Sequence, residues 1–555
     1  MPRRRDVTND HVGVQVELEP FHDDASSSSS LTSTDHPDSP LLEASSAHAS
    51  AVPKWLSPPP YASRRGAAAR HLLRVAQLLR PRRSWRSLVF HLVALYALVC
   101  VLRGQPLLAS SLPAQHAGPY DVGTVDIEVP VAAPRTLSAT ALRASGQPAY
   151  VLESVLFSLY YPVARGAPAA APPHLWIPRP VSLTAAGFAR LAHADFFFVR
   201  PLLTFLLWAV AGRIEIPAKV DAPLLPPLTG SNSSSFPLVV FSHGMASSRT
   251  DYTAYLGGLA ARGHVVAALE HRDGSGPGSR VQIKGRPDRD VLHFDARHVL
   301  ATPPMDAPTM KREQLAFREA EIREAIAVLG AVNDGHGRRV HEQNARGEGA
   351  TLPAWTGRLD FGSLVIAGHS YGATGALQAL RSDGIAPAAA AAGVVLDPGK
   401  SSGPLNADVD VPLLVVHSES WSRRWSLFHG RPHFDTVRDI VADSLNRTAA
   451  AWFLTARGTA HPSVTDAPLL EPLLLSAVTG ARFAVGAALR QYVDVTAGFL
   501  DAVRTGAPRD LLAEAVTHEE YDTWVSEDRE AAFPKEMAHW WQIHVAPGNG
   551  TGTRQ

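Results

Sequence analysis

The pentapeptide Gly368-His-Ser370-Tyr-Gly372 holds the residue types best suited to nucleophilic chemistry in this chain. It fits G-x-S-x-G, in which a serine occupies a tight turn between a strand and a helix. The apolar run SLVIA precedes the motif and the helix-favouring ATGALQAL follows it. The turn brings strand and helix close together, so small residues are needed at both of its ends. The pattern predicts Ser370 as a nucleophile at the carboxyl edge of a sheet. The alternative is a glycine turn whose serine only caps the helix.

A serine needs a general base, and the base needs an acid that orients it. In such sites the chain order is serine, acid, histidine, and acid and histidine each follow a strand. Asp397 ends the apolar run GVVLD, and His461 follows AWFLTA through a short turn. His417 also lies at a strand end, but choosing it would leave the histidine after the last strand without a role. The order therefore predicts a catalytic triad of Ser370, Asp397 and His461, with Glu419 as the reserve acid.

Acyl transfer also creates an oxyanion, which preorganised backbone amides must receive. One donor is normally the residue after the nucleophile, here Tyr371. The segment FSHGM supplies the other, because Gly244 permits close backbone approach and Met245 would present its amide. A plain turn at the end of a strand is the alternative for His243 and Gly244.

The elements that would position these residues begin near Phe236. Short apolar runs alternate with helical patterns, the clearest helix being Lys311 to Leu329. Runs that are apolar throughout are typical of parallel strands covered on both faces. Strand–helix alternation then predicts an α/β-hydrolase fold, a mostly parallel, doubly wound sheet, within residues 118–545. The expected strands are FPLVVFSHG, VVAALEH, SLVIAGHS, GVVLDP, VPLLVVHSES and AWFLTARGTAH.

Composition excludes several other classes of function. Lys+Arg and Asp+Glu both number 52, so the net charge does not indicate a nucleic-acid partner. The single cysteine, Cys100, permits neither an intrachain disulfide nor a thiolate metal cluster. HExxH and nucleotide-binding glycine motifs are missing from the sequence. We therefore expect no metal and no organic cofactor.

The N-terminal part differs from the rest of the chain. Residues 1–63 are polar and rich in serine and proline, which predicts a disordered tail. Residues 64–86 are strongly basic, and 87–102 form an uncharged apolar segment. A buried core helix is one interpretation of that segment. We favour a single membrane anchor with the basic N-terminal side cytosolic and the catalytic domain lumenal or extracellular.

A second apolar stretch, Phe196 to Gly212, is interrupted by Arg200 and Pro201. Its longest run without a charge or proline is too short to cross a membrane. The stretch is expected to be either a core helix or a helix lying in a lipid interface. The sequence leaves the two interpretations open.

Several segments beyond the serine motif carry a distinctive pattern: Gly118–Gly123, Leu159–Pro162, Phe241–Met245, Glu270–Asp273, Arg312–Arg318, Gly368–Gly372 and Leu396–Pro398. The EHRD segment after the second core strand, combined with GHSYG, is much more specific than GHSYG alone. By these segments the chain resembles the platelet-activating-factor acetylhydrolase family, in its plasma and intracellular type II group with fungal members. The resemblance covers roughly residues 118 to 470.

The resemblance implies calcium-independent hydrolysis of the sn-2 ester of glycerophospholipids with a short or oxidised acyl group, of phospholipase A2 type. It also supports Asp397 over Glu419 as the acid. We expect Glu270 to Asp273 to form a structural polar cluster at a strand end; a catalytic role for these residues is the alternative. A phospholipid and a membrane are the expected partners. A general carboxylesterase or lipase, and a non-catalytic membrane-anchored interaction module, stay as alternatives.

Overall fold

The computed structural model of the chain describes residues 84–102, 112, 117–227, 234–381, 390–423 and 426–548. The chain divides into two units, residues 18–107 and residues 1–17 with 108–555. The expected disordered tail and all but the end of the basic segment lie outside the described residues. Helix α2 belongs to the smaller unit, and all other elements named below belong to the larger one.

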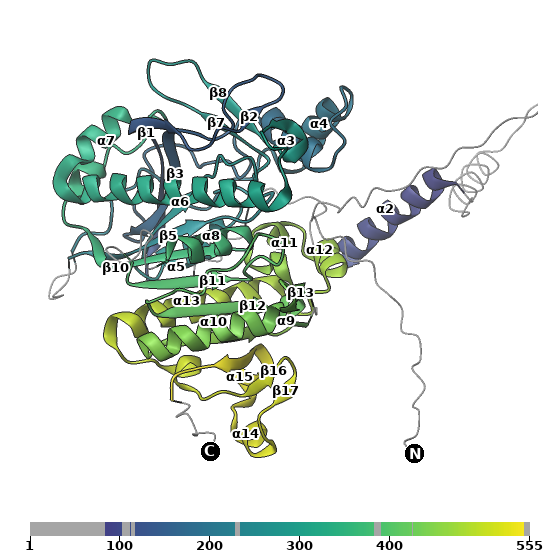
Figure 1. Ribbon diagram of the computed structural model, residues 1–555, viewed down its shortest axis with the longest axis vertical. Coiled ribbons are helices and arrows are strands. Elements are labelled where there is room, and N and C mark those ends of the chain that lie inside the picture. Colours follow the sequence, from purple (N-terminus) through teal and green to yellow (C-terminus); the bar gives the residue numbers. More distant parts are fainter. Residues whose placement is uncertain are drawn as a thin grey trace, which may run out of the picture. The chain divides into compact units, whose positions relative to one another are not determined.

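A ten-stranded sheet forms the centre of the larger unit, in the order β18-β15-β12-β11-β10-β5-β6-β3-β1-β4 (Figure 1). The six strands from β15 to β6 run parallel, and β3 and β18 are antiparallel to their inner neighbours. The strands are β1 (Asp121–Thr136), β3 (Val151–Val163), β4 (Lys219–Val220), β5 (Phe236–Ser242), β6 (Val265–Leu269), β10 (Leu359–His369), β11 (Ala392–Leu396), β12 (Leu413–Ser418), β15 (Ala451–Ala456) and β18 (Trp541–Val545).

Helices cover both faces of the sheet, and each face has its own apolar core. Helices α6, α8 and α10 pack on one face and α5 and α13 on the other. Their bounds are α3 (Val181–Leu191), α4 (Val199–Ala211), α5 (Thr253–Ala260), α6 (Ala307–Ala331), α7 (Gly337–Gln343), α8 (Tyr371–Ala379), α9 (Glu419–Arg423), α10 (His433–Thr448), α11 (Ala467–Leu470), α12 (Pro472–Thr479), α13 (Val485–Thr505), α14 (Glu527–Ala532) and α15 (Lys535–Trp540).

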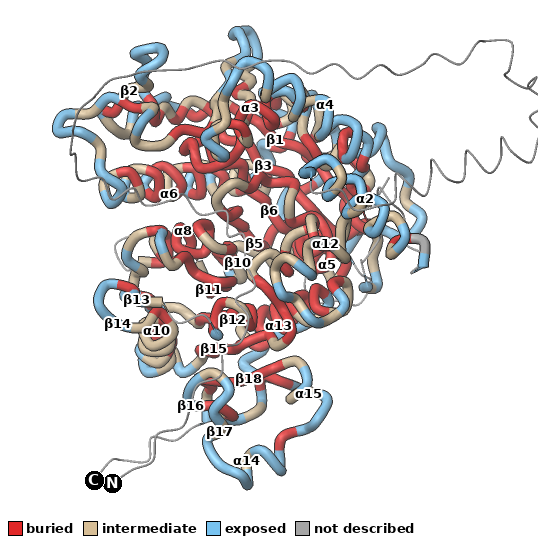
Figure 2. Tube along the Cα trace, turned by 90° about the vertical axis from the view of Figure 1, so that its right-hand side faces the viewer, coloured by how far each residue is buried: buried red, intermediate tan, exposed pale blue. Residues whose placement is uncertain are grey.

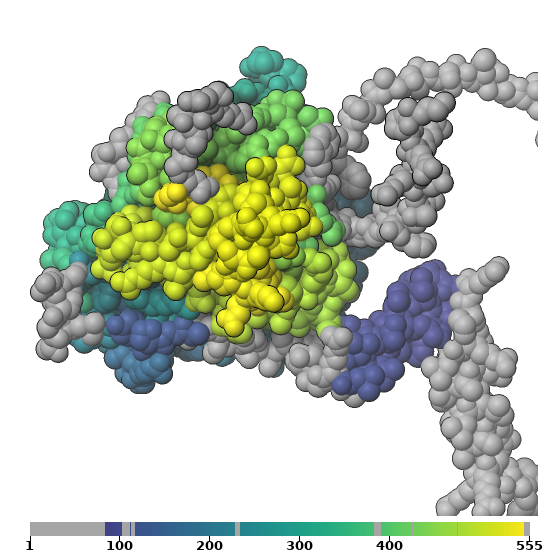
Figure 3. Space-filling model, turned by 90° about the horizontal axis from the view of Figure 1, so that it is seen from below, coloured from purple at the N-terminus to yellow at the C-terminus, as the bar shows by residue number. Residues whose placement is uncertain are grey.

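Four small two-stranded sheets complete the unit, and the C-terminal segment, yellow in Figure 3, lies against one side of it. The small strands are β2 (Ala141–Leu142), β7 (Gly278–Val281), β8 (Arg289–Leu292), β9 (Val299–Leu300), β13 (Leu427–Phe428), β14 (Arg431–Pro432), β16 (His518–Glu520) and β17 (Thr523–Trp524). The six expected strands correspond to β5, β6, β10, β11, β12 and β15, and the expected helix lies within α6. The predicted α/β fold is confirmed.

The EHRD segment after β6 lies in a buried network of charges. Asp273 pairs with Arg318 of α6 at 2.7 Å, and neither side chain is exposed to solvent. His271 contacts Glu321 at 2.7 Å, and Glu270 contacts Arg249 at 3.2 Å. Buried charges are retained only when partners compensate them. These pairs therefore tie β6 to α6 and to the segment after β5.

The predicted membrane anchor is wrong. Among the described residues, no helix has both the length and the apolar character needed to cross a bilayer. Helix α2 spans Trp85–Leu102, and its 18 residues rise about 27 Å, less than the roughly 30 Å of a hydrocarbon core. Arg86 lies in its first turn and His91 near its middle. The predicted single-pass topology, with a cytosolic N terminus and a lumenal or extracellular catalytic domain, is wrong with it.

The second apolar stretch forms α4, which is not a core helix. Of its residues only Ala211 is buried. Phe197, just before the helix, is 89% exposed, and Figure 2 shows the α4 region largely in the colour of exposed residues. The exposed large apolar side chains here are Phe196, Phe197, Phe198, Leu202, Phe205, Leu206, Trp208 and Val210.

Replacing Arg318 by Met should destabilise the fold, because Asp273 would keep a buried charge without its cation. Breaking a buried pair in this way costs about 3 to 5 kcal/mol. Urea unfolding measures the loss. Arg323→Met in the same helix is the control, since Arg323 is exposed and pairs with Glu319 at the surface. Equal stability of the two variants would contradict the structural role of the pair.

Candidate active site

Ser370 lies at the turn between β10 and α8 with φ 56° and ψ −120°. This left-handed backbone is rare for a residue with a side chain and persists only where its surroundings enforce it. A Cβ added at Gly368 would lie 2.2 Å from the carbonyl oxygen of Gly372. One added at Gly372 would lie 2.0 Å from the carbonyl oxygen of Ser242. Both glycines are therefore required sterically, as the motif predicted.

The three residues of the predicted triad form one hydrogen-bonded chain. The Ser370 hydroxyl donates to His461 Nε2 over 3.0 Å. His461 Nδ1 donates to Asp397 Oδ2 over 2.9 Å. Asp397 is buried, whereas Ser370 and His461 keep partial access to solvent. The arrangement allows the imidazole to accept the serine proton while the carboxylate fixes its tautomer.

Further contacts separate the two candidate acids. Asp397 accepts hydrogen bonds from the backbone amide and the hydroxyl of Ser418, over 2.6 and 2.7 Å. Glu419 instead accepts from the Gly458 amide over 2.5 Å and pairs with Arg482. The reserve acid thus supports the turn that leads to His461 and has no hydrogen bond to the imidazole.

The predicted oxyanion donors lie on either side of the serine. A Cβ at Gly244 would be 3.2 Å from Ser370 Cβ, so the turn after β5 runs directly beside the nucleophile. The Gly244 amide donates to the Tyr252 hydroxyl over 3.1 Å. Within the described ranges, the amides of Met245 and Tyr371 have no hydrogen-bond acceptor. Both are available to a negatively charged oxygen at the site.

His369 connects His461 to the turn after β5, which carries a predicted oxyanion donor. Its Nε2 donates to the carbonyl oxygen of His461 over 3.1 Å, which leaves Nδ1 to accept from the Tyr252 hydroxyl over 2.9 Å. Burial, followed by the charge of His461, holds the pKa of His369 well below its ordinary value, so the ring is neutral. The Tyr252 hydroxyl also accepts from Gly244, so one chain of hydrogen bonds runs from the oxyanion turn to His461.

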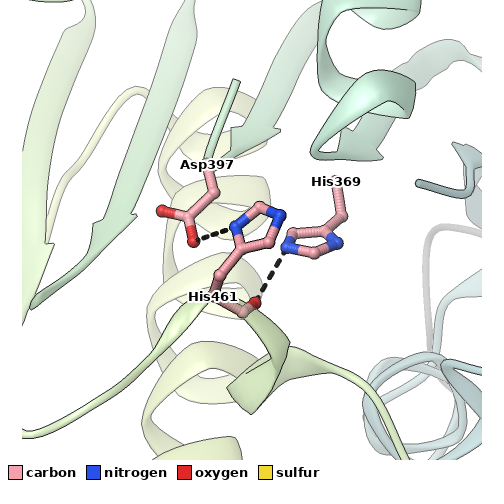
Figure 4. A group of neighbouring side chains, drawn as sticks. All are labelled: His369, Asp397 and His461. Atoms are coloured by element: carbon pink, nitrogen blue, oxygen red, sulfur yellow. Dashed lines mark hydrogen bonds and ion pairs between the residues drawn. The ribbon is translucent and has the colours of Figure 1, made fainter. Parts of the chain in front are cut away.

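Figure 4 shows His461 between Asp397 and His369. Their ligand-type atoms lie within 4.8 Å of one another, close enough to hold a metal ion. However, the His369 nitrogen that faces His461 carries a proton for a carbonyl oxygen. The other His369 nitrogen is occupied by the Tyr252 hydroxyl, and His461 Nδ1 is bound to Asp397. The donor set as arranged does not fit a metal ion.

Trp421 of α9 packs flat against the imidazole of His461. The ring centroids are 4.0 Å apart and the planes differ by 12°. The indole Nε1 donates to the carbonyl oxygen of Pro398 over 3.0 Å, which fixes the indole beside the acid loop. An aromatic face also attracts the imidazolium that forms when His461 takes a proton.

Arg318 supports the other side of the site. Its guanidinium donates to the carbonyl oxygen of His243 over 2.6 Å and lies 4.5 Å from the ring centroid of Tyr371. Tyr371 in turn donates its hydroxyl to Gln314 Oε1 over 2.9 Å. The buried charge network therefore reaches both elements that carry the predicted oxyanion donors.

Sequence reasoning did not identify Tyr252, Ser418, Trp421 or the roles of His369 and Arg318. Arg318 and His369 lie inside conspicuous motifs, but neither motif indicates a hydrogen-bond partner distant in sequence. Trp421, two residues after the reserve acid, could have been noticed as an aromatic residue following a strand end.

The fold and the arrangement around Ser370 are those of the α/β-hydrolase class. Within that class the chain belongs to the platelet-activating factor acetylhydrolase family, because the model of platelet-activating factor acetylhydrolase, isoform II, matches residues 109–504. This confirms the family indicated by the sequence motifs.

Individual relatives are more distant. A platelet-activating factor acetylhydrolase of Cavia porcellus is 27% identical over 311 residues, 54% of this chain and 59% of the relative. One of Canis lupus familiaris is 29% identical over 31% of this chain and 36% of its own length. The chain thus matches less than two thirds of the length of each relative. A ferulic acid esterase from Streptomyces cinnamoneus shares 19% identity with a TM-score of 0.46, over 73% of this chain and 96% of the esterase.

Asp397→Asn should reduce ester hydrolysis by about 10⁴-fold, because the amide favours the wrong tautomer of His461. Glu419→Gln should reduce it far less, since Glu419 supports only the turn at Gly458. Turnover of a chromogenic acetate ester, with thermal unfolding as a control for folding, compares the two variants. If Glu419→Gln lost most of its turnover while Asp397→Asn kept its turnover, Glu419 rather than Asp397 would be the acid.

Proposed function

We propose that the protein is a calcium-independent serine esterase that removes short or oxidised sn-2 acyl groups from glycerophospholipids. The observation that carries the proposal is the hydrogen-bonded chain from Ser370 through His461 to Asp397. Membership of the acetylhydrolase family supplies the substrate class.

In the acylation step, Ser370 Oγ attacks the acyl carbonyl carbon while His461 Nε2 takes the hydroxyl proton. The carbonyl oxygen becomes an oxyanion, which accepts from the amides of Met245 and Tyr371. His461 then gives its proton to the departing glycerol oxygen as the carbon–oxygen bond breaks. The acyl group is left on Ser370.

In the deacylation step, a water molecule loses a proton to His461 and attacks the acyl carbon. Ser370 leaves with the proton returned by the imidazole, and the free fatty acid is released. Asp397 keeps Nδ1 of His461 protonated throughout and stabilises the imidazolium. Side chains and amides of the chain serve every step, which is why we propose that calcium is not required.

Two other functions fit the same fold. A general carboxylesterase or lipase would use the same triad, and family membership is what favours phospholipid over a simple ester. A non-catalytic interaction module would not need a strained serine aligned with a histidine and a buried carboxylate. Covalent reaction of Ser370 with an active-site probe would distinguish an enzyme from that module.

A fluorophosphonate probe should label the wild-type protein and fail to label Ser370→Ala, which should lose activity by several orders of magnitude. The wild type should prefer acetyl over long sn-2 acyl chains and keep its activity in excess EDTA. Unlabelled wild type would support the non-catalytic module. Equal rates on long and short chains, or on simple esters and phospholipids, would support the general esterase.

We further propose that the protein works at a lipid surface through the exposed apolar residues between Phe196 and Val210, called here the α4 surface. Monomeric proteins rarely expose so many large apolar side chains together. A groove of about 850 Å³ between α3 and α4 combines Phe205 and Trp208 with Arg179 and Arg200. Aromatic residues lined by arginines, of which Arg200 pairs with Asp195, suit a membrane interface.

Phe197→Ser combined with Trp208→Ser should weaken binding to anionic phospholipid vesicles by at least about tenfold, because each buried aromatic contributes about 1.5 to 3 kcal/mol. Hydrolysis of a monomeric acetate ester should change little. Vesicle flotation measures the binding. Leu427→Ser is the matched control, since Leu427 is 61% exposed on β13. Unchanged vesicle binding of the double variant would exclude the α4 surface as the contact.

A further inference from the structure

Lysine is rare in this chain, which makes the positions of its lysines informative. Of 52 basic residues only six are lysine, and the other 46 are arginine. Two of the six, Lys311 and Lys400, contact Met245 and Trp421, which adjoin the proposed site. The full set is Lys54, Lys219, Lys284, Lys311, Lys400 and Lys535.

Lys311 lies in the first turns of α6, next to the proposed oxyanion donors. Its Nζ is 4.0 Å from Met245 Sδ and 4.6 Å from the ring centroid of Tyr371. The Lys311 carbonyl oxygen lies 3.3 Å from the Tyr371 hydroxyl oxygen. Since Met245 and Tyr371 flank Ser370, the ammonium group lies on the oxyanion side of the nucleophile.

Lys400 lies three residues after Asp397, on the side of the base. Its Nζ donates to the carbonyl oxygen of Trp421 over 2.9 Å and is 4.6 Å from the indole centroid. Trp421 is the residue that stacks on His461. One aromatic ring therefore connects the Lys400 ammonium to the catalytic imidazole.

The loop after Asp397 carries Lys400 and then passes beside Lys311. A Cβ added at Gly403, three residues beyond Lys400, would lie 3.8 Å from Lys311 Cβ. Both lysines are only partly exposed, so solvent screens their charges less than on an open surface. An ammonium is a compact charge that binds phosphate as a point cation.

We infer that Lys311 and Lys400 form a subsite for the anionic phosphate of the substrate. The inference rests on the proposed function and specifies what distinguishes a phospholipid from a neutral ester at this site. Only a few covalent bonds separate the sn-2 ester of a glycerophospholipid from its phosphorus atom. When the ester carbonyl lies at Ser370, we therefore expect the phosphate to lie within reach of Lys311 and Lys400.

Two substrates that differ only in the headgroup test the subsite: 1-alkyl-2-acetylglycerol and its phosphocholine ester, both kept monomeric. For Lys311→Met and for Lys400→Met, the ratio of kcat/KM for the phospholipid to that for the neutral ester should fall about tenfold. Lys311→Arg and Lys400→Arg should restore most of the ratio. Lys284→Met, whose ammonium contacts the Glu342 carbonyl oxygen at the surface, should leave it unchanged.

If the lysines were merely structural, kcat/KM would fall equally for both substrates and their ratio would not change. An unchanged ratio, in the single variants or in the double variant Lys311→Met with Lys400→Met, would overturn the inference. Glycerophosphocholine, which has the phosphate but no acyl ester, should competitively inhibit hydrolysis of the neutral ester. Its inhibition constant should rise at least about tenfold in the double methionine variant.

The inhibition experiment separates the subsite from the proposed function. A wild type that cleaves the neutral ester but no phospholipid would contradict the proposed function, and inhibition by glycerophosphocholine would still decide whether the lysines bind phosphate. Inhibition of equal strength in the wild type and the double variant would overturn the subsite even if phospholipid is a good substrate.

Discussion

The left-handed backbone of Ser370 is the constraint on which the rest of the site depends. It requires a glycine at 368 and at 372, because any Cβ there would meet backbone atoms at 2.2 Å or less. The close approach also fixes α8 against β10 and the turn after β5. The spacing between the serine hydroxyl, the Tyr371 amide and the Met245 amide is thus set by backbone packing before any substrate binds.

Such a turn is strained, so the surrounding structure has to hold it. Arg318 contributes to this from the interior, since it binds Asp273, the His243 carbonyl oxygen and the Tyr371 ring at once. A guanidinium can do so because its donors form a rigid planar fork. The EHRD segment therefore has a physical relation to GHSYG. Its Asp273 is the carboxylate that keeps the buried Arg318 in place.

The sequence predicted those parts of the molecule that local pattern determines. Continuous apolar runs identified the six inner strands, and the turn chemistry at Gly368 and Gly372 located the serine. Strand β1 is not a continuous apolar run, because charged residues interrupt it at Asp126 and Glu128. Both are buried, and their partners Arg249 and Arg272 lie more than 100 residues away. The predicted anchor is wrong because α2 has only 18 residues, with Arg86 in its first turn and His91 near its middle.

His461, the proposed base, is held from more directions than a triad alone requires. Asp397 fixes Nδ1 of His461, Trp421 restricts one face of the ring, and His369 holds the backbone carbonyl. Because His369 also reaches Gly244 through Tyr252, a displacement of the base would disturb the oxyanion turn as well. The proposed base and the proposed oxyanion donors are consequently held as one unit, so binding of a substrate would not need to supply the free energy of ordering them.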